Sequence, residues 1–186
     1  MQLNMIKKPL FLIIAAITVA SCTQNDPFAI GKDTLGPLTK TTPIRDLEKV
    51  FVNDSVVILD GRSEFVNAGS TIQVFEMPSS KLLLRIMPKN ATDSSLVDNI
   101  QIMDDRYVTD AGVSLKSTFK DIASNYTIKR IDNIINAAVI FVNESDVYFT
   151  IDKKHLPGDL MISTSTKIET TQIPDDAPIK YLMVGW

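Results

Sequence analysis

The sequence predicts one α+β domain made of two tandem repeats, each a short helix followed by an antiparallel β meander. The first observation behind this prediction is that segments 42–51 and 117–126 share one pattern, a capping residue followed by apolar residues two, five and nine positions later. The second is that each segment precedes several short stretches in which apolar and polar residues alternate. Strands that follow a helix, rather than alternate with helices, favour α+β over a doubly wound sheet.

Composition sets the size and class of the protein. The chain has 186 residues, of which 45% are hydrophobic and 22% charged, with a formal net charge of −3. This supports a packed core and argues against a disordered chain. The near-neutral charge gives no basis for a nucleic-acid partner, and the basic doublets at 129–130 and 153–154 are expected to be solvated strand ends. We expect residues 36–186 to form the domain, with similar halves at about 36–106 and 107–186.

Residues 1–21 are typical of a cleaved bacterial lipoprotein signal peptide. Lys7 and Lys8 precede an apolar run over 9–19, which is too short to span a hydrocarbon core of roughly 30 Å. The run leads into residues 19–22 (VASC), which resemble a lipobox. In lipoproteins the Cys thiol receives a diacylglycerol, the chain is cut before it, and the new amine is acylated, for example with palmitate. An ordinary signal peptide that carries a Cys near its cleavage site is the alternative.

Cys22 is the candidate lipidation site. It is the only cysteine of the chain, so it has no disulfide partner. Several acyl chains give stable membrane anchoring where a single chain is marginal. Residues 22–35 are typical of a lipidated tether, because they are polar and interrupted by Pro and Gly. Thr23, rather than Asp, follows the cysteine and favours the outer membrane, so we expect a lipid-anchored protein of the bacterial cell envelope.

The two predicted helices begin with capping chemistry. In the first, Thr42 can accept from free N–H groups, Pro43 suits the first helical position, and Asp46 lies in the positive first turn. In the second, Ser117 is the expected cap. The strands that follow are predicted at about 54–59, 70–77, 81–87 and 98–104, and at about 127–132, 137–143, 146–152, 166–173 and 180–185.

A set of turn, cap and helix-face residues carries a family resemblance. These residues are 36–39 (GPLT), 42–43 (TP), 110–113 (DAGV), 117–122 (STFKDI) and 173–180 (IPDDAPIK). They resemble the RpoE-regulated lipoprotein family of bacterial envelopes, over nearly the whole chain that would follow cleavage. The resemblance implies an envelope location and brings no activity with it. Some members carry a cysteine pair in the second half that this chain lacks, so no disulfide is carried over.

His155 is the only histidine and precedes a Pro-Gly turn. A Ser-His-Asp triad would need it, although a solvated turn histidine is the more common situation. A single histidine also excludes a His-rich zinc site. With Cys22 acylated, the chain has no thiol nucleophile. We therefore predict no catalytic residue, no metal and no cofactor.

Two acidic pairs, Asp104-Asp105 and Asp175-Asp176, are the remaining candidates for chemistry. Adjacent carboxylates can bind a hard cation such as Ca²⁺, although neither segment matches an EF-hand loop. Two carboxylates that face each other across a cleft can hydrolyse a glycosidic bond. Aspartates in turns more commonly stabilise the local backbone.

The sequence therefore favours a non-enzymatic, lipid-anchored envelope protein that binds another envelope component. The membrane is its first expected partner, through Cys22, and an envelope protein is the candidate second. One alternative is a carboxylate-dependent hydrolase of envelope glycans. The other is a carrier for a small ligand or lipid, which would need an apolar cavity of at least ~300 Å³ between the two halves.

Overall fold

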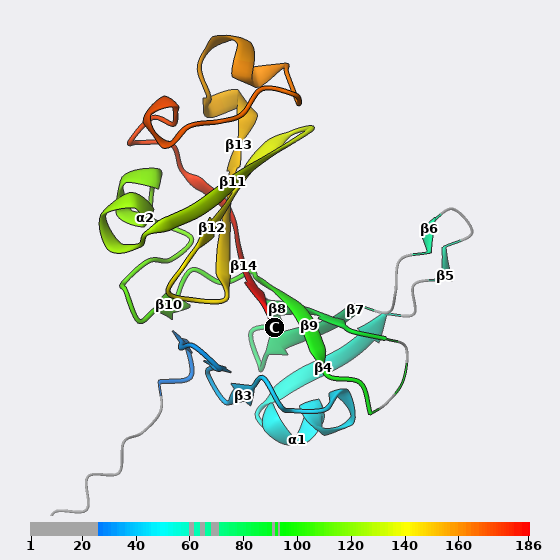
Figure 1. Ribbon diagram of the computed structural model, residues 1–186. Helices are drawn as coiled ribbons and strands as arrows, with labels where there is room; N and C mark the ends of the chain where they lie inside the picture. Colours follow the sequence, from blue (N-terminus) through cyan, green and yellow to red (C-terminus); the bar gives the residue numbers. More distant parts are fainter. Residues whose placement is uncertain (1–25, 60–61, 64–65, 68–70, 91, 93) are drawn as a thin grey trace, which may run out of the picture.

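The structure is a computed structural model that describes residues 26–59, 62–63, 66–67, 71–90, 92 and 94–186 (Figure 1). The predicted signal peptide and the predicted lipidation site Cys22 lie outside these residues. Within them the chain is mostly β, with fourteen strands and only two α-helices, of four and seven residues. The predicted α+β class is therefore wrong.

A large antiparallel sheet of eight strands dominates the fold (Figure 1). Its strands lie in the order β11-β12-β13-β14-β9-β8-β7-β4. One half consists of β4 (Asp54–Leu59), β7 (Thr71–Glu76), β8 (Lys81–Pro88) and β9 (Val97–Ile102). The other half consists of β11 (Ile128–Ile134), β12 (Ala137–Val142), β13 (Val147–Asp152) and β14 (Ile179–Gly185). The two halves meet where β9 pairs with β14.

The two halves do not form the predicted repeats of a helix and a meander, because their strands make one continuous sheet and the helices contribute little to it. Val184 of β14 lies opposite Ile100 of β9, and one cluster of buried side chains draws on both halves. This pairing closes an edge that would otherwise expose free N–H and C=O groups. The helices are too short to make a layer: α1 (Leu47–Val50) buries one side chain, and α2 (Phe119–Asn125) buries two.

The helix starts also differ from the prediction. A 3₁₀ turn, η1 (Ile44–Asp46), precedes α1, and the side chain of Thr42 caps neither of them. The cap of α2 is Thr118 rather than Ser117. Its backbone N–H donates to the Asp121 carboxylate at 2.8 Å. The position of Asp121, three residues after Thr118, therefore determines where the helix begins. Ser117, the earlier hydroxyl residue, does not.

The predicted strand at 166–173 is absent, since this segment contains the 3₁₀ turn η4 (Thr170–Gln172). It belongs to the connection from β13 to β14, which also holds η2 (Lys153–His155) and η3 (Gly158–Met161). β13 is already paired with β12 on one side and with β14 on the other, so the connecting segment cannot pair with it. Ile168 and Ile173 are buried in this segment as isolated contacts to the core.

A small sheet holds the N-terminal segment against the rest of the molecule. Its strands are β1 (Ala29–Ile30), β2 (Thr34–Leu35), β3 (Leu38–Thr39) and β10 (Val108–Thr109), in the order β10-β1-β2-β3. Ile30 and Leu35, in the segment predicted as tether, are buried in the main core. The two-residue strands β5 (Arg62–Ser63) and β6 (Val66–Asn67) form a further pair.

One face of the large sheet carries the core, and the opposite face is partly open. The register places one row of core residues across five strands, each at most 2% exposed: Val147, Val184, Ile100, Ile86 and Ile72. The neighbouring row points the other way and is partly exposed: Tyr148, Met183, Gln101, Arg85 and Gln73. This alternation is the one expected for strands with a buried and a solvated side.

Ile100→Ala tests whether the two halves unfold as one unit. Ile100 is fully buried where the halves meet, so its truncation should destabilise the protein by about 3 kcal/mol. The urea transition, followed by far-UV circular dichroism, should stay single. Ile58→Ala, at a side chain 58% exposed, serves as the control and should cost under about 0.5 kcal/mol. A transition that splits in two would contradict the single core.

Candidate functional site

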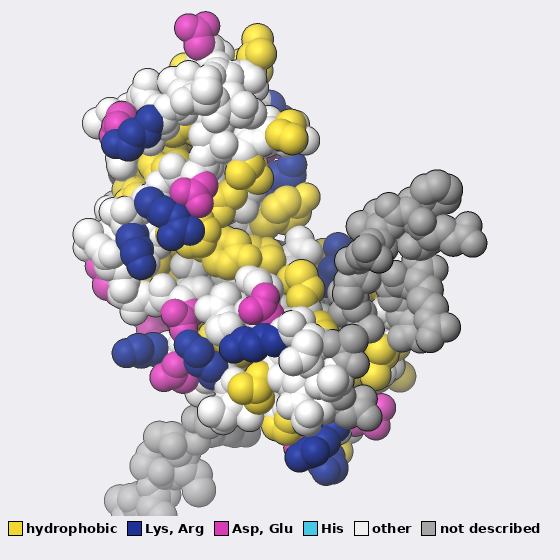
Figure 2. Space-filling model, turned by 45° about the vertical axis from the view of Figure 1, so that its right-hand side comes forward, with side chains coloured by type: hydrophobic (Ala, Val, Ile, Leu, Met, Phe, Trp, Pro, Cys, Tyr) yellow, Lys and Arg dark blue, Asp and Glu magenta, His cyan; other side chains and the backbone are white. Residues whose placement is uncertain are grey.

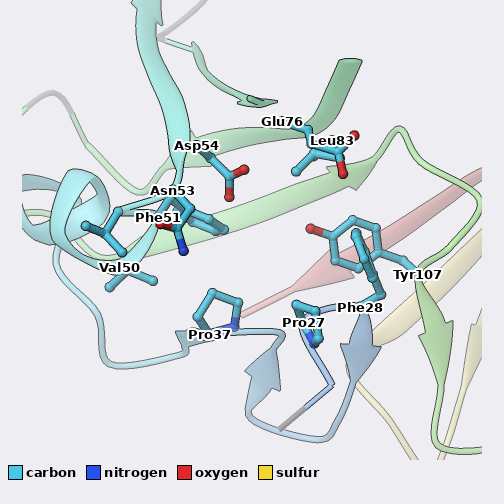
Figure 3. Close-up of a pocket in the computed structure, with 11 residues that line it drawn as sticks. Pro27, Phe28, Pro37, Val50, Phe51, Asn53, Asp54, Glu76, Leu83 and Tyr107 are labelled. Atoms are coloured by element: carbon cyan, nitrogen blue, oxygen red, sulfur yellow. The ribbon is translucent and has the colours of Figure 1, made fainter. Parts of the chain in front are cut away.

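A pocket of about 500 Å³ opens beside the N-terminal segment (Figure 3). Its wall comes from distant parts of the chain: the residues before β1, the turn from α1 into β4, the strands β7 and β8, and the residue before β10. The carboxylates of Asp54 and Glu76 lie on one side of it, and the rings of Phe28 and Tyr107 lie on the other (Figure 3). The lining therefore combines charge with an apolar surface.

The parallel pairing of β1 with β10 brings the N-terminal segment to this pocket. Ala29 lies opposite Val108, so the residues before them, Phe28 and Tyr107, are neighbours. Their rings meet edge to face with centroids 5.1 Å apart. The guanidinium carbon of Arg106 lies 4.2 Å from the centroid of the Phe28 ring. These contacts fix the aromatic wall.

Four charged side chains beside the pocket form a network of ion pairs. Asp104 is fully buried and accepts from Lys81 Nζ at 2.9 Å and from Arg106 Nη2 at 2.7 Å. Arg106 Nη1 also donates to Glu76 Oε1 at 2.7 Å. Burial by itself raises the pKa of Asp104, but the hydrogen bonds from Arg106 and Lys81 outweigh it and hold that pKa well below its usual range. Two cations and two carboxylates thus balance one another.

Asp54 is a carboxylate of the pocket outside this network. Among the described residues, no Lys or Arg nitrogen lies within 4.0 Å of its oxygens. It lies opposite Glu76 in the β4–β7 pair, so both side chains project from the same face of the sheet. Burial, and after it the negative charge of Glu76, raises the pKa of Asp54. The backbone N–H of Met77 and the charge of Arg106 act in the opposite direction on this pKa but do not outweigh the first two effects. Asp54 is therefore a half-buried carboxylate without an ion pair among the described residues.

The hydroxyl of Tyr107 is a second polar group in need of a partner. The residue is 1% exposed, its hydroxyl forms no hydrogen bond within the part of the chain that the structure describes, and it points into the pocket (Figure 3). Burial, followed by the charges of Asp54 and Asp104, raises the pKa of Tyr107, so the phenol is neutral. A neutral phenol can both donate and accept. The carboxylate and the hydroxyl are the polar groups that the pocket offers to a ligand.

The acidic pairs singled out in the sequence lie on different segments and have other partners. Asp104 belongs to the network described above. Asp105 pairs with Lys116 at 2.9 Å, and Asp175 lies 3.8 Å from Lys120. None of these carboxylates lines the pocket. Their contacts are those of charges that stabilise the local fold.

The other predicted candidates are also separate from the pocket. Asp176 is exposed in the turn before β14, and His155 is half-buried in η2. Among the described residues, no group of three His, Cys, Asp or Glu side chains could hold a metal ion. Sequence reasoning missed Asp54, Glu76 and Tyr107, because no local motif connects them.

A shallower groove of about 360 Å³ lies on the open face of the large sheet, over β11 to β13. A bulge between Ile128 and Arg130 brings both Lys129 and Arg130 to the groove. The guanidinium carbon of Arg130 lies 3.6 Å from the centroid of the Phe141 ring, which stacks on Tyr148. Figure 2 shows hydrophobic side chains in a band on the upper part of the molecule, with charged side chains beside them.

The comparisons with known proteins give one similar fold and no related sequence. No family model matches the chain, and no curated protein matches it. Among solved structures, the chain is similar to the crystal structure of the uncharacterized protein YfeY from Escherichia coli, at 13% identity and a TM-score of 0.53. That match covers 85% of this chain and 99% of YfeY. Within the residues described, no helix has the length and apolar character needed to cross a membrane.

Asp104→Asn tests the ion-pair network. The amide keeps the shape but loses the charge-assisted bonds to Arg106 and Lys81, so the free energy of unfolding should fall by about 2 kcal/mol at pH 7. Because the folded pKa of Asp104 is lowered, its contribution is present above about pH 4 and is lost as the pH falls further. The difference between the two proteins should therefore shrink below pH 4. Urea denaturation at several pH values measures it, and a difference independent of pH would contradict the assignment.

Proposed function

We propose that this protein is a lipid-anchored component of the bacterial envelope that acts by binding, and that the pocket beside the N-terminal segment is its recognition site. The observation that carries the proposal is a pair of polar groups in the pocket. Among the described residues, the Asp54 carboxylate has no ion pair and the Tyr107 hydroxyl has no hydrogen bond. A half-buried carboxylate without a counter-ion and a buried hydroxyl without a hydrogen bond both cost stability. A bound ligand would satisfy both groups.

The lipid anchor is the second part of the proposal and rests on the lipobox that ends at Cys22. The resemblance to the RpoE-regulated lipoprotein family supports an envelope location, and Thr23 after the cysteine favours the outer membrane. Pro27 lines the pocket and follows Cys22 by five residues. A chain of that length reaches at most about 18 Å, so the anchor would hold the pocket close to the membrane surface.

The hydrolase predicted from the acidic pairs gains no support, because none of their four carboxylates lines the pocket. The two carboxylates that do line it, Asp54 and Glu76, lie on the same side of the pocket, and Glu76 is paired with Arg106 at 2.7 Å. The carrier alternative required a cavity between the two halves of the sheet. The volume of the pocket, about 500 Å³, exceeds the ~300 Å³ expected for a carrier. However, the pocket lies between the first half of the sheet and the N-terminal segment. A small ligand held at the membrane surface therefore fits the proposal better than a lipid enclosed between the halves.

Cys22→Ser tests the anchor. The native chain should sediment with the membrane fraction, and it should be released by detergent but not by alkaline carbonate. Serine cannot form the thioether to diacylglycerol, so the variant should lose the detergent-extractable form. Fractionation followed by immunoblotting measures this. Because the cut before the cysteine follows lipidation, the variant keeps its signal peptide, so labelling with palmitate is measured beside the fractions. A variant that still incorporates palmitate would show that Cys22 is not the anchor.

Photo-crosslinking from the pocket rim tests the binding role. A benzophenone amino acid at Asn53, an exposed residue that lines the pocket, should yield a discrete adduct in native envelopes. The same group at Asn143, which is exposed in the turn before β13, is the matched control and should not yield this adduct. Mass spectrometry of the purified chain identifies what is attached. The same adducts from both positions, or none from Asn53, would count against the pocket as a recognition site.

A further inference from the structure

We propose that the ligand of this pocket is a small organic cation, with one ammonium group between Asp54 and Tyr107 and a short apolar body against the aliphatic and aromatic wall. This inference rests on the proposed function, because it names the ligand class of the same site. It is built from the charge balance of the pocket, the unmet hydrogen bonds, and the shape of the lining.

The charge balance leaves one negative charge in the pocket. The described residues that line the pocket include no Lys or Arg, and the two cations of the neighbouring network, Lys81 and Arg106, pair with Asp104 at 2.9 and 2.7 Å. Arg106 also binds Glu76 at 2.7 Å. These two cations therefore balance these two carboxylates, and Asp54 remains without an ion pair among the described residues. A ligand with one positive charge would compensate it.

The unmet hydrogen bonds call for a donor with several N–H groups. The Asp54 carboxylate can only accept, and the Tyr107 hydroxyl can accept through its lone pairs. Figure 3 shows both groups directed into the same pocket from opposite sides. An ammonium group has three donors and no acceptor, so one group can bind both side chains and leave a third donor for water or a backbone carbonyl.

An anion or a neutral ligand fits these groups less well. An anion would face the carboxylates of Asp54 and Glu76, and it would add to the two effects that already raise the pKa of Asp54, which are burial and, after it, the charge of Glu76. A neutral hydroxyl group could donate one hydrogen bond to Asp54. It would leave the charge of that carboxylate uncompensated in a partly desolvated site, where charge pairs are stronger than in water.

The lining beyond these groups accommodates an apolar body. Phe51 and Leu83 are 2% and 3% exposed and line the pocket together with Val50 and the ring of Phe28. A volume of about 500 Å³ lies in the ordinary range for small-molecule sites. The geometry thus fits an ammonium group on a short alkyl or aryl chain.

Such an ammonium group could belong to a free amine or to the headgroup of an ethanolamine phospholipid, which would be near the pocket in the anchored protein. The shared chemistry is a primary ammonium on a two-carbon chain. The experiment therefore uses the full chain in nanodiscs of phosphatidylglycerol, which has no amine, with and without added phosphatidylethanolamine.

The test compares two probes of nearly equal size, phenethylamine and 2-phenylethanol, by calorimetry and by chemical shifts of the pocket residues. The native chain should bind the amine at least about tenfold more tightly than the alcohol, as expected for a charge-assisted bond. Asp54→Asn keeps the shape of the side chain and should remove this preference. Asp132→Asn, at a half-buried carboxylate of β11 paired with Arg130, is the matched control and should retain it.

The outcomes separate this inference from the proposed function. Equal binding of both probes to the native chain would leave the pocket as a binding site but would overturn the proposal that its ligand is a cation. A preference for the amine that survives in a folded Asp54→Asn variant would also overturn this proposal, because a group other than Asp54 would then recognise the ammonium. No binding of either probe would count against both proposals. If the preference holds, weaker amine binding in discs with phosphatidylethanolamine assigns the headgroup as ligand, and unchanged binding assigns a free amine.

Discussion

The pairing of β9 with β14 is the interaction on which the rest of the structure depends. It joins the two halves of the large sheet through only three register pairs, Met183 with Gln101, Val184 with Ile100 and Gly185 with Asn99. Side-chain and backbone contacts extend this narrow seam: Tyr148 Oη donates to Asn99 at 2.7 Å, and Trp186 N–H donates to the Asp98 carbonyl at 2.8 Å.

The pocket depends on a second set of long-range contacts. The two residue pairs between β1 and β10 place the N-terminal segment, and the Phe28–Tyr107 contact follows from them. The network of Lys81, Asp104, Arg106 and Glu76 then connects β7 and β8 to the segment before β10. Within the described part of the chain, the same contacts that stabilise this end of the molecule leave Asp54 without an ion pair and the Tyr107 hydroxyl without a hydrogen bond. Stability and the candidate function therefore involve neighbouring but different residues.

The groove on the open sheet face has a different character from the pocket. Arg130 pairs with Asp132 at 3.1 Å and lies over Phe141, and Tyr148 donates to Asn99, so these polar groups already have partners. Lys129 also lines that groove and has no ion pair among the described residues, but it is exposed, so water can solvate its charge, whereas Asp54 is half-buried and Tyr107 is buried. This contrast is the reason to place recognition at the N-terminal end of the molecule, where the proposed anchor would also lie.

The sequence by itself determined the strands that alternate strictly, such as Val147–Asp152, because a strand with one buried face imposes that period on its own residues. The lipobox that ends at Cys22 is also a local motif, and the lipid anchor that it indicates stays a prediction. Tertiary structure decided the rest. Residues 166–173 have strand-like alternation, but they join no sheet because β14 pairs with β13. Asp54, Glu76 and Tyr107 share no local motif, and only the pairing of β4 with β7 and of β1 with β10 brings them to one pocket.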